Sequence, residues 1–205
     1  ERNFATFTDV LNYMAGASSP GNDVTLTINS KIQQAAQDAL VGRVGACVVL
    51  DPNTGAVLAL ASAPTYNAAD FESMLEAANS GNAEDDSILL NRATQALYAP
   101  GSTFKMVTLT TALEDDVATA DEVFASPGTM DIGNAPVSNV KKRSYGKITL
   151  AQAMWYSSNT VFGQLGVMMG AQRLVEGAER FGFNKQIAFD LPLAMSLMPD
   201  PNEMT

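Results

Sequence analysis

The sequence predicts an α+β fold in which an antiparallel sheet is flanked by helices. Two nearly continuous apolar runs, residues 44–50 and 56–63, are separated by Asp51-Pro52-Asn53-Thr54-Gly55, a composition typical of a turn. Apolar residues at helical spacing recur before and after this hairpin. Because both runs are apolar at almost every position, we expect a central hairpin that helices cover on both faces.

The segments around the hairpin complete the first part of the predicted fold. Alternation of apolar residues with threonine predicts a short strand over residues 24–28. Ser30 and Gln33 form a capping-box pattern that opens a helix. The expected inner stripe of this helix is Ile32, Ala35, Ala36, Ala39 and Leu40. A second, short helix is predicted around residues 70–77.

The second half of the chain predicts further helices. Residues 119–147 are rich in Pro, Gly and Asn, and we expect them to form an excursion over the same side as the candidate site described below. Thr149 and Gln152 form another capping box, which opens a helix over residues 150–156. The remaining predicted elements are helices at 161–169 and 172–181 and a strand at 186–191.

Length and composition limit the classes of protein. A chain of 205 residues, 46% of them hydrophobic, can bury a substantial core. We expect residues 1–21 to be a linker or the tail of a preceding module, and residues 22–205 to belong to one domain. No apolar run approaches the roughly eighteen residues of a membrane span, and no signal peptide opens the chain.

Charge and residue usage argue against several kinds of partner. The net charge is −10 and the basic residues are scattered, which argues against nucleic-acid binding. The one basic cluster, Lys141-Lys142-Arg143, is interpreted as a solvated loop. The chain has no histidine and one cysteine, Cys47, so we expect no metal site, no cofactor and no internal disulfide.

Ser102 and Lys105 are the first pair of candidate functional residues. Ser102 follows a Pro-Gly corner at the predicted start of a helix, where free N–H groups and the helix dipole favour negative charge. Lys105 lies three residues further on, on the same helix face and within reach of the Ser102 hydroxyl. The helix beyond is apolar nearly all round, which predicts burial. Burial would lower the pKa of Lys105 and make a neutral amine available as general base.

Lysine is the one plausible base for a serine nucleophile in this chain. Without histidine a Ser-His-Asp triad cannot be assembled, and a serine hydroxyl needs a base to become nucleophilic. The alternative is that Ser102 is an ordinary helix N-cap and Lys105 a solvated lysine of the first turn, a pattern that chance produces often.

Ser157-Ser158-Asn159 is the second candidate constellation. It lies between two predicted helices, where a hydroxyl could shuttle a proton and an amide could hold a peptide carbonyl. The alternative is a helix junction whose polar side chains only cap helices. Ser138-Asn139 is a competing pair without a helix before it and carries little weight. Ser158, the middle residue of its motif, is interpreted as a spacer.

In this order along the chain, Ser102-Thr103-Phe104-Lys105 and Ser157-Ser158-Asn159 resemble the Ser-x-x-Lys and Ser-x-Asn motifs of the transpeptidase domain of penicillin-binding proteins. The flanking pattern is most similar to the class B, monofunctional type, which works beside a glycan polymerase. The likeness covers residues 22–190 and includes Leu26-Thr27-Ile28, residues 51–60 and Asn91-Arg92-Ala93.

The resemblance implies the penicillin-binding protein and serine β-lactamase type of fold and a D,D-transpeptidase that cross-links peptidoglycan stem peptides. Ser102 would attack the D-Ala-D-Ala bond to form an acyl-enzyme, and Lys105 would accept its proton. Ser157 would pass a proton to the leaving amine, and Asn159 would hold the peptide backbone. The Ser102 N–H would supply half of an oxyanion hole. β-Lactam antibiotics would acylate the same serine, on the extracytoplasmic face of the bacterial membrane, with the anchor outside these residues.

The third motif of the family, Lys-Thr-Gly, does not occur in the 205 residues. We therefore expect residues 22–205 to be the front part of the transpeptidase domain, incomplete at the C-terminus, with weak or no penicillin acylation of its own. A hairpin without its later partner strands exposes an unpaired edge, so we also expect self-association through that edge.

Three other functions stay open at this point. A β-lactamase needs a positioned base for deacylation, and Glu176 and Glu179 fall on an ordinary amphipathic helix. A penicillin-sensing receptor domain would be acylated and stay acylated. A catalytically silent scaffold would recruit cell-wall partners without chemistry.

Overall fold

The computed structural model describes residues 11, 14–15, 23–72 and 88–204. The chain divides after Asn67 into two compact units, residues 1–67 and 68–205, called unit 1 and unit 2. The predicted boundary near residue 21 and most of the helix predicted at 70–77 lie outside the described residues. Of that helix, the structure describes a short 3-10 turn, η1 (Ala68–Asp70), and the two residues after it.

The predicted hairpin is confirmed in unit 1. Strands β1 (Gly45–Leu50) and β2 (Val57–Ala63) pair antiparallel, with an irregularity in register at Leu50. In the turn, the Asp51 carboxylate accepts a hydrogen bond from the Asn53 N–H at 2.9 Å. Gly55 has a φ of +74°, a conformation that favours glycine, so the turn composition accounts for the tight connection.

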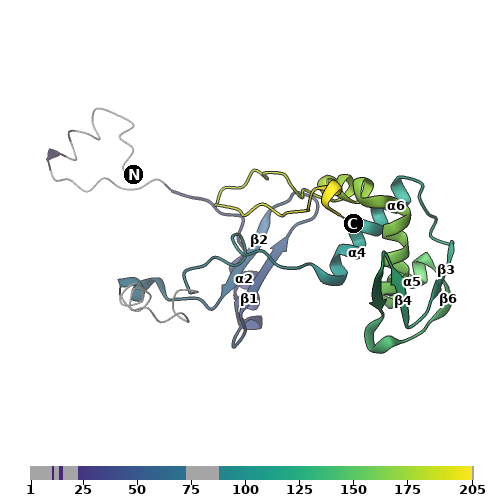
Figure 1. The fold of residues 1–205 in the computed structure, drawn as a ribbon. Helices are drawn as coiled ribbons and strands as arrows, with labels where there is room; N and C mark the ends of the chain where they lie inside the picture. The colour runs from purple at the N-terminus through teal and green to yellow at the C-terminus, as the bar shows by residue number, and fades with distance from the viewer. Residues whose placement is uncertain (1–10, 12–13, 16–22, 73–87, 205) are drawn as a thin grey trace. The chain divides into compact units, whose positions relative to one another are not determined.

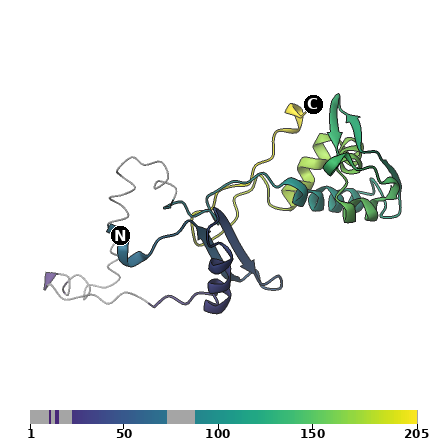
Figure 2. The same ribbon diagram turned by 90° about the horizontal axis from the view of Figure 1, so that it is seen from below.

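Helix α2 (Ser30–Ala39) packs on one face of this hairpin, as both ribbon views show (Figures 1 and 2). The other face, which carries Val48 and Leu60, has no helix of the described part of unit 1 against it. Ala35 and Ala39, expected in the inner stripe, are exposed. The contact consists of Ala36, Ala59 and Ala61, with Ile32, Leu40, Cys47 and Val49 packed against them.

The start of α2 differs from the predicted capping box. The N-cap is Asn29, whose side chain accepts hydrogen bonds from the N–H groups of Lys31 and Ile32 at 3.0 and 3.3 Å. The Gln33 side chain binds the backbone of β2 instead. It donates to the Leu60 carbonyl at 3.0 Å and accepts from the Leu60 N–H at 2.7 Å.

The strand predicted at residues 24–28 is wrong, since these residues form no strand. The segment meets β2 through the Thr27 hydroxyl, which donates to the Val57 carbonyl at 2.6 Å, and the Asn29 N–H, which donates to the Leu58 carbonyl at 2.9 Å. The chain turns into α2 directly afterwards, before a regular ladder can form. The Thr27 and Gln33 side chains and the Asn29 N–H therefore cover the edge of β2.

Helices α4 (Lys105–Glu114), α5 (Leu150–Tyr156) and α6 (Asn159–Arg180) form the body of the described part of unit 2 (Figure 1). The 3-10 turn η2 (Gly101–Phe104) leads into α4 (Lys105–Glu114). Helix α5 (Leu150–Tyr156) begins with the predicted capping box of Thr149 and Gln152, which is confirmed. The two helices predicted after it are both present within α6 (Asn159–Arg180), because Gly170, with φ 76° and ψ 163°, divides α6 between them.

Two small antiparallel sheets fill the segment predicted as an excursion. Strand β3 (Val123–Ser126) pairs with β6 (Gly146–Thr149), and β4 (Thr129–Ile132) pairs with β5 (Ala135–Ser138). The 3-10 turns η3 (Val140–Lys142) and η4 (Pro201–Glu203) complete the elements of the described residues. The strand predicted at 186–191 is wrong, because these residues pair with no other strand.

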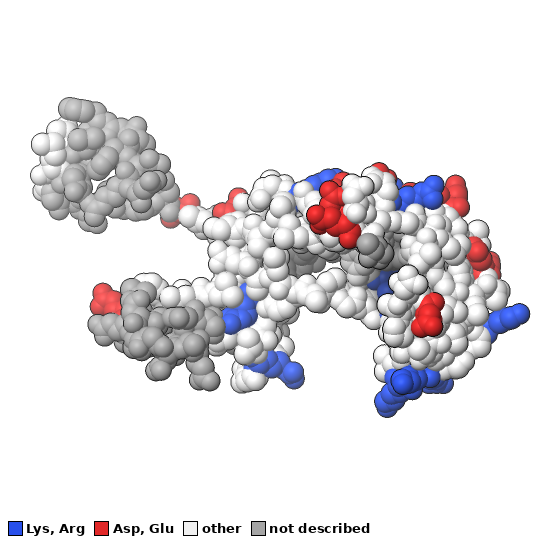
Figure 3. Space-filling model, viewed as in Figure 1, with Lys and Arg blue, Asp and Glu red and all other residues white. Residues whose placement is uncertain are grey.

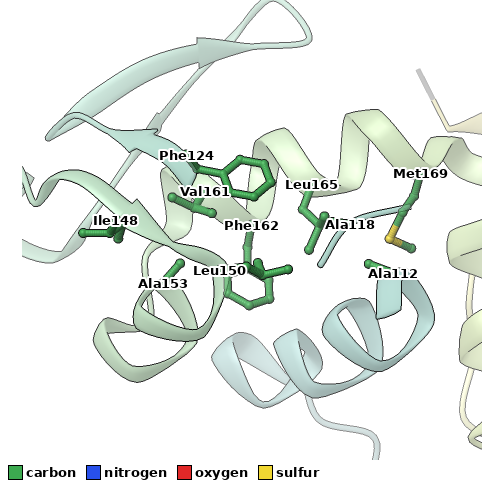
Figure 4. Packing of buried hydrophobic residues seen from close by; sticks show 10 residues of the cluster. All are labelled: Ala112, Ala118, Phe124, Ile148, Leu150, Ala153, Val161, Phe162, Leu165 and Met169. Carbon is green, nitrogen blue, oxygen red and sulfur yellow. The ribbon is translucent and has the colours of Figure 1, made fainter. Parts of the chain in front are cut away.

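The core of unit 2 lies between the helices and β3 and β6. Figure 4 shows its side chains pointing toward one another, from Ala112 on α4 to Leu165 on α6 (Figure 4). Helix α4 was expected to be buried nearly all round, but it is buried on one side only. It buries Val107, Thr108 and Thr111, whereas Met106 is 55% exposed. The core residues are Ala112, Ala118, Phe124, Ile148, Leu150, Ala153, Val161, Phe162, Leu165 and Met169.

On the face that Figure 3 shows, acidic and basic side chains lie in small groups between uncharged areas (Figure 3). Among the described residues, no helix is both long and apolar enough to cross a membrane. The described residues also contain no group of three or more acidic, cysteine or histidine side chains arranged to hold a metal ion.

Candidate active site

The turn before α4 positions Ser102 and Lys105. Gly101 has a φ of +54°, and Thr103 closes the turn by donating from its N–H and its hydroxyl to the Pro100 carbonyl at 3.2 and 2.6 Å. Ser102 is exposed, and its hydroxyl makes no helix-capping bond, because the N-cap position of the turn is Pro100. Lys105 is 8% exposed. The N-cap and solvated-lysine alternatives therefore do not describe this pair.

The corner between α5 and α6 positions Ser157 and Asn159. Ser157 ends α5 in the left-handed conformation, with φ 54° and ψ 45°. Ser158 is the N-cap of α6, and its hydroxyl accepts a hydrogen bond from the Val161 N–H at 3.3 Å. This reversal between two helices turns the side chains of residues 157 and 159 toward α4, although the two motifs lie far apart in the sequence.

Four oxygen atoms converge on the ammonium group of Lys105. Its Nζ lies 3.0 Å from Ser102 Oγ, 3.0 Å from both the carbonyl oxygen and Oγ of Ser157, and 2.6 Å from Asn159 Oδ1. The structure thus brings all four sequence-predicted site residues together. The Asn159 amide also donates to the Ser138 carbonyl at 2.8 Å, which directs its oxygen toward Lys105.

Burial controls the electrostatics of Lys105. Removal from water lowers the pKa of its ammonium group below the ordinary value of 10.5, because the charged form loses solvation. The Phe162 ring lies on one side, with its centroid 5.7 Å from Nζ. No carboxylate is paired with Lys105 in the described residues. A larger fraction of Lys105 is therefore neutral near pH 7 than for a solvated lysine.

This arrangement can move a proton between two hydroxyl groups. A neutral amine has two N–H donors and one lone pair. The Asn159 oxygen and the Ser157 carbonyl can accept both donors, which leaves the lone pair for the hydroxyl hydrogen of Ser102. Once protonated, the amine has a third N–H for Ser157 Oγ. The two hydroxyls therefore share one base.

Sequence reasoning missed a group of buried polar residues behind this corner. Ser158, interpreted as a spacer, is 1% exposed, and its hydroxyl lies 2.8 Å from that of Ser126 and 3.2 Å from the Asn139 oxygen. Asn139 belongs to the competing pair Ser138-Asn139, which has no predicted helix before it. It is 4% exposed and contacts Thr160 as well. The one sequence feature that pointed to Asn139 was its place in a second Ser-Asn pair.

A family model described as the penicillin binding protein transpeptidase domain matches residues 45–204. The peptidoglycan D,D-transpeptidase MrdA of Escherichia coli strain K12 is 33% identical over 182 residues, which cover 83% of this chain and 28% of the relative. The peptidoglycan D,D-transpeptidase PbpA of Mycobacterium tuberculosis strain H37Rv is 35% identical over 190 residues, 84% of this chain and 38% of the relative. The chain thus spans about a third of the length of these curated relatives.

Solved structures of transpeptidases have a fold similar to that of this chain. The D,D-transpeptidase domain of peptidoglycan glycosyltransferase from Eggerthella lenta has 69% sequence identity and a TM-score of 0.86 over 90% of this chain and 44% of that one. The imipenem acyl-enzyme complex of penicillin-binding protein A from M. tuberculosis has 32% identity and a TM-score of 0.80 over 93% of this chain and 47% of that one. The predicted α+β fold is therefore confirmed. The chain belongs to the penicillin-binding protein transpeptidase domain family.

Proposed function

We propose that this chain carries the residues that form the acyl-enzyme in a serine D,D-transpeptidase. Such an enzyme cross-links peptidoglycan stem peptides and is inhibited by β-lactams. The observation that carries the proposal is the position of one buried amine, Lys105 Nζ, at 3.0 Å from the hydroxyl oxygens of both Ser102 and Ser157. The relatives named as peptidoglycan D,D-transpeptidases and the imipenem acyl-enzyme complex of a structural neighbour support this choice of chemistry.

The first half-reaction forms an ester. Lys105 takes the hydroxyl proton of Ser102 while Ser102 Oγ bonds to the carbonyl carbon of the penultimate D-alanine, and the N–H of Ser102 helps to hold the oxyanion. The bond from that carbon to the terminal D-alanine nitrogen then breaks. Ser157 gives its proton to the leaving nitrogen and regains one from the Lys105 ammonium.

The second half-reaction transfers the acyl group. The amine of a second stem peptide attacks the ester, Ser102 leaves as an alcohol, and the proton of the amine returns to Ser102 along the same residues. Asn159 holds the amine of Lys105 in line and contacts the peptide backbone of the substrate. We also propose a location on the extracytoplasmic face of the membrane, because peptidoglycan lies there. A glycan polymerase as partner belongs to the same proposal.

Covalent labelling with penicillin tests the roles of Ser102 and Lys105. In the full-length protein, Ser102→Ala should abolish labelling, and Lys105→Ala should slow it by on the order of 10²–10⁴-fold, the usual value of a general base. Mass spectrometry of the peptide that contains residue 102 gives the rate. The matched controls are Ser144→Ala and Lys147→Ala, because both residues are exposed.

Several results would decide against the proposal or one of its parts. Labelling of Ser102→Ala at the wild-type rate would exclude Ser102 as nucleophile. Rapid hydrolysis of the acyl-enzyme would point to a β-lactamase, and acylation without stem-peptide turnover to a receptor domain. The 205 residues hold no Lys-Thr-Gly, so they should be labelled more slowly alone than in the full-length protein.

A further inference from the structure

Asn139 connects three segments of unit 2 through one buried amide. Its nitrogen donates to the carbonyl oxygens of Arg143 at 2.9 Å and Pro127 at 3.1 Å. Its oxygen accepts from the Thr160 N–H at 3.1 Å and from the Ser158 hydroxyl at 3.2 Å. A side chain that is 4% exposed and uses both ends of its amide has one favourable orientation.

The two hydrogen bonds that the Asn139 oxygen accepts come from the residues on either side of Asn159. The Thr160 N–H belongs to the first turn of α6, where backbone donors have no partner within the helix, and Asn139 supplies that partner from another segment. Ser158, on the other side of Asn159, caps the Val161 N–H. The Asn139 amide thus binds the backbone N–H of the residue after Asn159 and the side-chain hydroxyl of the residue before it.

The residue before Asn139 fixes the Asn159 side chain itself. The Ser138 carbonyl accepts a hydrogen bond from Asn159 Nδ2 at 2.8 Å, so Asn159 Oδ1 faces Lys105 Nζ, 2.6 Å away. Rotation of this amide by 180° would bring its NH₂ group against the amine and lose both bonds. Residues 138 and 139 therefore set both the place and the orientation of the acceptor that aligns Lys105.

From this geometry we infer that Asn139 is a positioning residue for acylation, an inference that rests on the proposed function. Among the described residues, no hydrogen bond joins Asn139 to Ser102 or Lys105. It acts through Ser158 and Thr160, which hold the 157–159 corner against the amine. When that corner shifts, the two acceptors of the Lys105 N–H groups shift with it, and the lone pair no longer points at the Ser102 hydroxyl.

The test is the acylation of Asn139→Ala by penicillin in the full-length protein. The first-order rate at saturating penicillin should fall on the order of 100-fold, while the concentration for half-maximal rate changes by less than about threefold. This split is expected because Ser102 and its turn are unchanged, whereas the displaced corner misaligns the proton transfer and shifts one substrate contact, that of Asn159. Leu165→Ala is the control, since it creates a cavity in the apolar core, whose buried residues include neither Asn139 nor Ser158.

Ser158→Ala provides a second variant in case Asn139→Ala does not fold. It removes the hydroxyl that donates to the Asn139 oxygen, so it should slow acylation in the same way. The inference is overturned if either folded variant is acylated at the wild-type rate, or if Leu165→Ala, matched in melting temperature, is slowed equally. Failure of the wild-type protein to be labelled at Ser102 would instead overturn the proposed function, which separates the two outcomes.

Discussion

At the scale of single residues, Lys105 combines two properties that oppose each other. Burial lowers its pKa, yet four oxygen atoms surround Nζ, and oxygen acceptors favour the protonated form. Desolvation dominates, so the direction of the shift is downward. A base that gains and loses one proton per half-reaction works best with a pKa near the working pH, and a lowered lysine pKa approaches that condition.

The rate of acylation should therefore rise with pH and reach a plateau at a pH below 10.5, the ordinary pKa of a lysine side chain. In the proposed mechanism the neutral amine is the base, and its fraction increases as pH rises through the lowered pKa of Lys105. The measurement is the penicillin acylation rate of the full-length protein between pH 5 and pH 10.

Lys105→Arg is the matched variant for this prediction. Arginine keeps a positive charge throughout that range and cannot act as a base, so acylation should be lost at every pH. A rate that does not change with pH, or an active Lys105→Arg protein, would show that Lys105 acts only as a charge.

At the scale of elements, α4 and α6 approach closely where Thr111 faces Gly177. A Cβ atom added at Gly177 would overlap with Thr111 Oγ1 and lie 2.6 Å from its Cγ2. Thr111 is fully buried, and its hydroxyl has no hydrogen-bond partner in the described part of the chain. The sequence of α6 thus places a glycine where the side chain of α4 needs the space.

Gly177→Ala should lower the free energy of unfolding by about 1–3 kcal/mol, the usual cost of overpacking. The control is Gly166→Ala in the same helix, where an added Cβ meets nothing within 4 Å. This change should raise stability by up to about 1 kcal/mol through helix propensity.

Denaturant unfolding of both variants checks these signs. In a double-mutant cycle, Thr111→Ala should reduce the cost of Gly177→Ala, because it removes the two atoms nearest the new methyl group. If Gly177→Ala instead raised stability, as Gly166→Ala should, the helices would not meet at Thr111.

At the scale of the whole molecule, the hairpin of unit 1 has one covered edge and one open edge. Gln33 binds both backbone polar groups of Leu60, which must therefore point away from β1. Leu60 is paired with Val48, so the N–H and carbonyl of Val48 point away from β2. In the described residues no strand pairs with β1 on that side. Val48 is 45% exposed and Leu50 54%.

The 205-residue chain should therefore associate with a second copy through β1. An exposed apolar strand edge is a template for pairing, and a lysine on such an edge opposes it. Val48→Lys should lower the fraction of dimer seen by sedimentation velocity. Val167→Lys, which places the same charge on an exposed valine of helix α6, should leave it unchanged. A monomer at all concentrations, or an equal effect of both variants, would contradict this prediction.

Local patterns predicted the elements whose hydrogen bonds are local. The capping box at Thr149 and Gln152 and the turn at Gly55 need only residues a few positions apart, and both are present. The capping box at Ser30 was wrong because the Gln33 side chain has a better partner in β2, 27 residues away in the sequence. The strand at 186–191 was wrong because a strand exists only through its neighbour, which sequence alternation does not reveal.

By itself, the sequence determined the family, the hairpin, the helix that follows Ser102 and the identity of Ser102, Lys105, Ser157 and Asn159 as candidates. It could do so because these residues stand in short motifs, and because the lack of histidine leaves lysine as base. The tertiary structure alone decided that the two motifs meet at one amine and that Ser158 and Asn139 hold one of them in place. Those contacts join residues distant in the chain, and their energy depends on burial, which no short pattern contains.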